Sequence, residues 1–114
     1  MRWVYAIAIE GDRFLMVFNK KRGGWEMPGG HVEQGEGAET AAKREFREET
    51  GQEFEPVVRV VQDDGAVFAG RVRYTGKHGE MRFELFEQLP EQLAFPEWEY
   101  REQIAWARTA LSLQ

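Results

Sequence analysis

The stretch GHVEQGEGAETAAKREFREETG, residues 30 to 51, decides the fold of this chain. Within it, three apolar side chains recur every four residues: Ala38, Ala42 and Phe46. This period predicts a helix from Gly37 to Thr50 that buries one apolar stripe, small at its start and large at its end. Gly51 follows at the position where a glycine in the left-handed conformation commonly ends a helix.

The same helix carries three glutamates on one side: Glu45, Glu48 and Glu49. A helix advances about 100° per residue, so these carboxylates share one arc and lie roughly 5 to 6 Å apart. Two like charges at that distance repel by about 3 kcal/mol at an effective dielectric near 20, and only Arg44 on this face opposes them. A solvated surface helix is the bland interpretation of such a run. The alternative is a site for a hard divalent cation such as Mg²⁺, which takes oxygen ligands.

Strand-like runs lie on both sides of this helix: Trp3 to Ile9, Phe14 to Phe18, Val57 to Val61, Ala66 to Tyr74 and Met81 to Phe86. A short extended piece, Trp25 to Gly30, ends in two glycines that allow close backbone approaches. Pro96 opens a second helix with one apolar face, made by Tyr100, Ile104, Ala107 and Leu111. The order of strands, helix, strands, helix predicts an α/β fold with a mixed sheet packed between helices.

Composition sets limits on the kind of protein. The 114 residues predict a single domain, residues 1–114, and the eight Phe, four Trp and three Tyr argue against disorder. With no cysteine, a disulfide framework and thiolate chemistry are impossible. The net charge of −5 argues against a partner such as duplex nucleic acid. No run is long enough to span a membrane, so we expect a soluble, cytoplasmic protein.

The helix and its flanks resemble the Nudix box, which is Gly, five residues, Glu, seven residues, then Arg-Glu-apolar-x-Glu-Glu-x-Gly-apolar. The matching positions are Gly30, Glu36, Arg44, Glu45, Phe46, Glu48, Glu49 and Gly51. Seven of these positions each require one residue type. At roughly one chance in ten for each, accidental agreement at all seven is about 10⁻⁷. The last position departs from the pattern, because Gln52 stands where an apolar residue is expected. Resemblance to this family, in its MutT-like group, implies an α/β/α sandwich over the whole chain.

The resemblance also implies roles for the motif residues. Glu45 and Glu49 would bind the metal directly, Glu48 would be a further ligand or activate water, and Gly29 would offer its backbone carbonyl. Mg²⁺ is the expected cofactor, with Mn²⁺ as the alternative ion. Arg44 would orient a box carboxylate through a salt bridge. The other motif residues would shape the loop and the helix: Gly30, Glu36 and Gly51.

The implied activity is that of a Nudix hydrolase, which cleaves a diphosphate linked to another moiety through attack of a metal-activated water on phosphorus. A carboxylate beside the water can take its proton. In this family the base can come from a downstream segment. Glu80 and Glu84 are the candidates, and Glu80 is preferred because it borders a Gly-rich turn. For both, an ordinary surface carboxylate is the alternative interpretation.

Substrate choice in this family depends on residues outside the box. The downstream residues typical of subgroups that act on ADP-ribose, dinucleoside polyphosphates, NADH and coenzyme A are absent here. By elimination the chain resembles enzymes that hydrolyse nucleoside triphosphates, unmodified or oxidised, to monophosphate and pyrophosphate. The aromatic candidates for stacking on the base are Trp3, Tyr5, Phe18 and Trp25, with core packing as the alternative. The basic candidates for the phosphates are Lys20, Lys21 and Arg22, with a solvated loop as the alternative. Trp98 and Trp106 are expected to be packing or edge residues.

Two rival functions remain open. Removal of 5′ pyrophosphate from RNA would use the same box, although the acidic composition counts against it. A non-catalytic nucleotide-sensing module on this fold would be expected to lose box carboxylates or to carry a DNA-binding domain. All the box carboxylates are present, and a chain of this length is not expected to hold a second domain. The resemblance also allows a homodimer.

Overall fold

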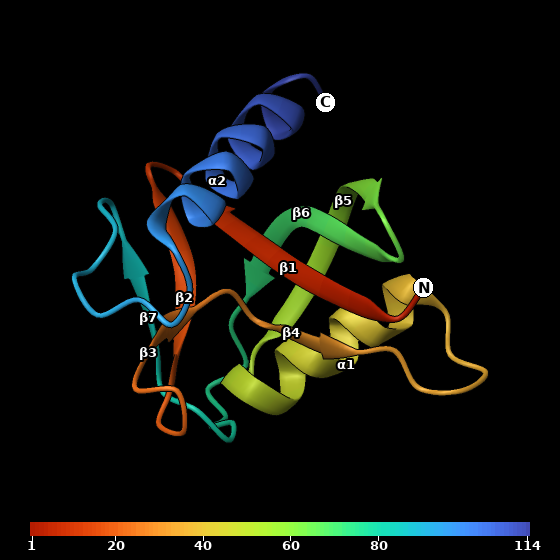
Figure 1. Ribbon diagram of the computed structural model, residues 1–114, viewed down its shortest axis with the longest axis horizontal. Helices are drawn as coiled ribbons and strands as arrows, with labels where there is room; N and C mark the ends of the chain where they lie inside the picture. Colours follow the sequence, from red (N-terminus) through yellow and green to blue (C-terminus); the bar gives the residue numbers. More distant parts are fainter.

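The computed structural model describes all 114 residues. Seven strands and two helices follow one another along the chain (Figure 1). They are β1 (Trp3–Glu10), β2 (Arg13–Asn19), β3 (Gly24–Glu26), β4 (Gly29–His31), α1 (Ala38–Thr50), β5 (Glu53–Gln62), β6 (Gly65–Arg73), β7 (Phe83–Phe86) and α2 (Glu97–Ser112). The two predicted helices are thus confirmed, and each lies after its own group of strands.

The strands form one mixed sheet whose main path runs β3-β2-β1-β6-β5. Strand β1 is central, since it pairs in parallel with β6 and antiparallel with β2 and β4. Strands β3 and β7 both pair antiparallel with β2. The register sets Tyr5 of β1 opposite Gly29 of β4, which places the two-glycine segment directly beside the central strand.

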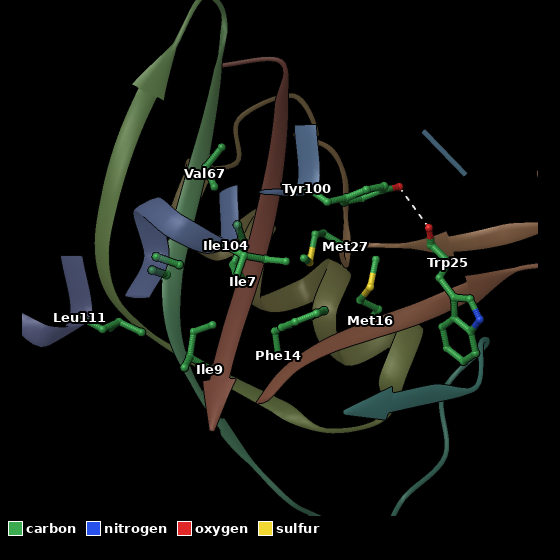
Figure 2. Close-up of a cluster of buried hydrophobic side chains, with 12 residues drawn as sticks. Ile7, Ile9, Phe14, Met16, Trp25, Met27, Val67, Tyr100, Ile104 and Leu111 are labelled. Atoms are coloured by element: carbon green, nitrogen blue, oxygen red, sulfur yellow. Dashed lines mark hydrogen bonds between the residues drawn. The ribbon is translucent and has the colours of Figure 1, made fainter. Parts of the chain in front are cut away.

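The two helices cover opposite faces of the sheet (Figure 1). Successive side chains of β1 point to opposite faces, so they contribute alternately to two cores, one beneath each helix. The core beneath α1 takes Val4, Ala6 and Ala8 from β1. The core beneath α2 takes Ile7 and Ile9. Figure 2 shows this second core, in which the Tyr100 hydroxyl donates a 3.1 Å hydrogen bond to the carbonyl oxygen of Trp25. The predicted α/β/α sandwich is confirmed.

Strand β5 begins four residues before the predicted start at Val57. It forms an edge of the sheet and pairs only with β6, so Pro56 is tolerated there. A bulge between Pro56 and Val58 takes up the resulting irregularity. The sequence prediction missed this first part of the strand because it contains Glu53, Glu55 and Pro56, which are uncommon in strands.

Strand β7 begins at Phe83 and not at the predicted Met81. The backbone N–H groups of Glu80 and Met81 instead bond to carbonyl oxygens at the end of α1. The predicted extended piece from Trp25 to Gly30 also differs, since it divides into β3 and β4, which pair with different strands. Neither helix is long and apolar enough to cross a lipid bilayer.

Candidate active site

Helix α1 presents its carboxylates toward β4 and ends where the sequence predicts. Gly51 has a φ of 79°, a left-handed conformation that glycine adopts without strain, and its N–H bonds to the carbonyl of Arg47. On the opposite strand, a side chain at Gly30 would displace the Glu45 carboxylate, which occupies that space. The two motif glycines therefore end the helix and admit its carboxylate.

Arg44 is the hub of the ion pairs at this site. Its Nε and Nη2 atoms donate hydrogen bonds of 2.8 and 2.9 Å to the two oxygens of Glu36. Its Nη1 atom donates to Glu45 at 2.7 Å and to Glu48 at 3.3 Å. The hydrogen bond from Arg44 lowers the pKa of Glu36 to about 2, whereas its carboxylate partners raise the pKa of Arg44. The salt bridge expected of Arg44 is present, and its role in orienting a metal ligand stays a prediction.

Glu49 is the most buried carboxylate of the motif, with 6% of the residue exposed. Burial raises its pKa to about 8, the hydrogen bond from the N–H of Gly29 opposes that rise, and the nearby charge of Glu45 adds to it. The pKa of Glu45 is raised as well, again mainly by burial. Folding has therefore placed acidic groups where ionisation is unfavourable, a pattern typical of functional sites.

The donor chemistry of these residues fits a hard divalent cation. Every candidate ligand supplies oxygen, and a bound cation would stabilise the ionised forms that burial disfavours at Glu45 and Glu49. In the arrangement shown, Glu45 bonds to Arg44 and Glu49 bonds to the N–H of Gly29. No group of three or more acidic or histidine side chains is gathered as a metal cage. The ligand roles of Glu45, Glu48, Glu49 and the Gly29 carbonyl stay predictions.

The two candidate bases occupy different surroundings. Glu80 lies in the loop before β7, and its charge contributes to the raised pKa values of both Glu45 and Glu49. Glu84 lies within β7, exposed and opposite Met16 of β2. The structure thus brings Glu80 within electrostatic reach of Glu45 and Glu49.

The predicted basic residues divide into two groups. Lys20 and Lys21 line a cleft of about 660 Å³ together with Phe18 and Glu80. Arg22 is instead paired with the buried Glu26 at 3.1 Å. The cleft therefore places the two lysines on the same surface as the candidate base.

A second cleft, of about 620 Å³, lies between the sheet and α2. Its aromatic lining consists of Trp3, Tyr5, Trp98 and Trp106. Burial, and then nearby carboxylates that include Glu26 and Glu49, raise the pKa of the Tyr5 hydroxyl. Tyr5 pairs with Gly29, whose N–H bonds to Glu49, so one residue of the aromatic cleft lies on the strand next to the acidic site. Trp106 packs against the core beneath α2, as expected of a packing residue. Trp98 and Trp106 also line this cleft, for which sequence periodicity gave no signal.

Trp25 differs from the other aromatic candidates. It is almost fully buried, with ring contacts to Phe18 at a centroid distance of 5.3 Å and to Phe86 at 4.9 Å. This packing leaves its ring little surface for a base. Sequence reasoning also missed Glu26, a buried carboxylate that contributes to the raised pKa of Glu49. The available signal was a lone charge between two large apolar residues, Trp25 and Met27, at the end of a short strand.

A family model described as the NUDIX domain matches residues 2–110. A Bacillus subtilis (strain 168) protein that carries the provisional name 8-oxo-dGTP diphosphatase is 50% identical over 42 residues. That segment covers 37% of this chain and 28% of that protein, so the match spans little more than a quarter of the relative's length.

Solved structures resemble the chain over most of its length. A MutT NUDIX hydrolase from Burkholderia pseudomallei has a TM-score of 0.67 at 25% identity, covering 90% of this chain and 97% of that chain. An ADP-ribose pyrophosphatase from Streptococcus suis has a TM-score of 0.75 at 21% identity, covering 95% and 89%. The second likeness concerns the fold alone, and the two together agree with the sandwich described above.

Proposed function

This chain belongs to the NUDIX family, and we propose that it is a metal-dependent pyrophosphohydrolase that converts a nucleoside triphosphate to a nucleoside monophosphate and pyrophosphate. The observation that carries the proposal is the buried Glu49 of the acidic site, which is held by the Gly29 N–H and whose pKa is raised to about 8 by burial and, to a lesser degree, by the charge of Glu45. The one arginine of that site, Arg44, already engages several carboxylates. A polyphosphate would be repelled there unless divalent cations compensated the charge.

The residues that would hold Mg²⁺, or Mn²⁺ in its place, are Glu45, Glu48, Glu49 and the backbone carbonyl of Gly29. When bound, the ion polarises phosphorus and lowers the pKa of an attacking water. Glu80, within electrostatic reach of Glu45 and Glu49, would accept the proton of that water. Arg44 would hold Glu45 and Glu48 in place through the hydrogen bonds described above.

The two clefts suit the two parts of a nucleotide. The aromatic cleft offers Tyr5 and the largely exposed Trp98 as surfaces on which a base can stack. The lysine cleft offers Lys20 and Lys21 to the negative charges of the phosphates. Tyr5 of β1 lies opposite Gly29 of β4, so the residues proposed to bind the base and those proposed to bind the metal include a pair on adjacent strands.

Support for a triphosphate comes from elimination among family subgroups and from the partial match to the Bacillus subtilis relative named for 8-oxo-dGTP. An oxidised purine triphosphate is accordingly the first substrate to try. Stacking alone does not distinguish oxidised from unmodified bases, so both belong to the proposed class.

The test is a hydrolysis panel with Mg²⁺ in which products are separated by chromatography. Its substrates are unmodified and oxidised nucleoside triphosphates, ADP-ribose, a dinucleoside polyphosphate and a 5′-triphosphorylated RNA. We expect monophosphate and pyrophosphate from a triphosphate. Turnover of RNA alone or of a dinucleotide alone would overturn the proposed substrate class, although the proposed metal-dependent hydrolysis by the motif carboxylates would stand. Nucleotide binding without turnover of any substrate would favour the sensing module.

A further inference from the structure

Gln52 departs from the family motif and is buried, with 3% of the residue exposed. Its Nε2 atom donates hydrogen bonds of 2.7 Å to the carbonyl of Lys77 and 3.2 Å to the carbonyl of Thr50. Its Oε1 atom accepts a 2.7 Å hydrogen bond from the N–H of Thr75. The amide therefore joins the end of α1 to a loop, residues 75–80, that is distant in sequence.

The same loop is also fixed to the helix at its other end. The N–H of Glu80 donates to the carbonyl of Glu48 at 2.8 Å, and the N–H of Met81 donates to the carbonyl of Glu49 at 2.9 Å. A side chain at Gly79 would collide with the Glu49 carbonyl, so the two backbones are in direct contact. These bonds satisfy helix carbonyls that otherwise have no partner within the helix.

The loop ends at Glu80, whose charge acts on Glu45 and Glu49. The position of that carboxylate therefore depends on how firmly residues 75–80 are held to α1. An apolar residue at position 52 would leave the Lys77 carbonyl and the Thr75 N–H, whose hydrogen bonds to Gln52 are partly buried, without their amide partners. Such unpaired groups favour a rearrangement that brings them to water.

We propose that Gln52 is a positioning residue, whose side-chain amide holds the 75–80 loop against α1 and so fixes Glu80 at the carboxyl end of that helix, where its N–H bonds to the Glu48 carbonyl. The proposal rests on the proposed function, in which Glu80 accepts a proton from water. It assigns a purpose to the one motif position that departs from the family pattern.

The kinetic test compares Gln52→Leu, Glu80→Gln and the double variant with Mg²⁺ and the best triphosphate of the panel. We expect Gln52→Leu to lower kcat about tenfold while KM stays within about twofold, because substrate contacts lie elsewhere. In the Glu80→Gln background the same change should lower kcat no further. An equal loss in both backgrounds, no loss at all, or full activity of Glu80→Gln would overturn the proposal.

A second readout does not require activity. Amide hydrogen exchange at Glu80 and Met81 should become at least about tenfold faster in Gln52→Leu than in the unsubstituted protein, since the loop opens locally. Unchanged exchange there would overturn the proposal even if kcat fell. If the unsubstituted protein hydrolysed nothing in the panel, the proposed function would fail, and exchange would still show whether Gln52 holds the loop.

Two further variants guard against a loss of folding. Leu111→Ala removes a buried side chain of α2 on the opposite face of the sheet, and it should lower stability without changing kcat where the protein is folded. Gln52→Glu keeps an acceptor for the Thr75 N–H and loses the donor to Lys77, so it replaces Gln52→Leu if that variant does not fold. We expect an intermediate loss of kcat from it, and unchanged kcat with unchanged exchange would overturn the proposal.

Discussion

The backbone N–H of Gly29 donates a 3.2 Å hydrogen bond to Oε1 of the buried Glu49, which ties β4 to the last turn of α1. This bond favours the ionised carboxylate, yet burial outweighs it and raises the pKa of Glu49 to about 8. The site therefore holds a carboxylic acid that a cation would convert to a ligand.

Glu49→Gln should change how stability depends on pH in the metal-free protein. The unfolded chain loses the Glu49 proton near the ordinary value of 4.5, whereas the folded protein keeps it until about 8. Between these values the folded state binds the extra proton, so stability falls as pH rises, by up to about 1.4 kcal/mol per pH unit. Urea unfolding with a chelator at pH 5 to 8 should show this slope, and Glu49→Gln should lack it. Equal slopes in both proteins would contradict the raised pKa.

Arg44→Lys should destabilise the protein, because one ammonium cannot replace a guanidinium that bonds both oxygens of Glu36 and also Glu45. We expect the thermal midpoint at pH 7 to fall by about 5 °C or more. Since the pKa of Glu36 is lowered to about 2, its stabilising pair is complete above about pH 4.5. The difference between the two proteins should shrink as pH falls from there toward 2.

Arg47→Lys is the matched control for that variant. Arg47 also bonds both oxygens of one glutamate, Glu53, but its side chain is 54% exposed. Exposed pairs contribute little to stability. If the thermal midpoint of Arg47→Lys fell as far as that of Arg44→Lys, replacing either arginine of α1 would have the same effect. The loss of stability could then not be assigned to the ion pairs of Arg44.

Trp98→Ala should raise KM for a nucleoside triphosphate about tenfold with little change in kcat. Trp98 lines the aromatic cleft and is 60% exposed, and stacking on a base contributes about 1–3 kcal/mol. Tyr74→Ala removes an exposed aromatic residue outside that cleft and should leave KM unchanged. Equal KM values for the two variants would place the base elsewhere.

Lys20→Gln combined with Lys21→Gln should raise KM several-fold and weaken its dependence on salt, because both lysines line the cleft that holds Glu80. Steady-state kinetics at low and high ionic strength would measure both effects. Lys43→Glu, on the outer side of α1 beside Glu39, lowers the net charge by the same two units and supplies a matched control. If it altered KM as much as the double variant, net charge alone would explain the effect.

Much of the fold could be predicted because its signals are local. The period of Ala38, Ala42 and Phe46 and the glycine at position 51 defined α1 almost to the residue. Strand pairing has no such local signal. The parallel pairing of β1 with β6 joins segments on either side of α1, and it depends on which faces the two helices cover.

The candidate site divides in the same way. The link between Arg44 and Glu48 could be predicted, since residues four apart share a helix face, whereas the shorter bond from Arg44 to its neighbour Glu45 does not follow from that spacing. The burial of Glu26 and the contacts of Gln52 arise only from packing between distant segments. Trp98 resembled a packing residue because nothing in the local pattern shows that a cleft opens beside it.

We propose above all that the buried Glu49 is a metal ligand required for hydrolysis of a nucleoside triphosphate. The most direct measurement is the turnover of one nucleoside triphosphate by the unsubstituted protein and by Glu49→Gln, with Mg²⁺ and with a chelator. We expect monophosphate and pyrophosphate only with Mg²⁺, and a loss of kcat of about a thousandfold or more in the folded variant. Near-normal turnover by folded Glu49→Gln, or turnover that persists with the chelator, would contradict the claim.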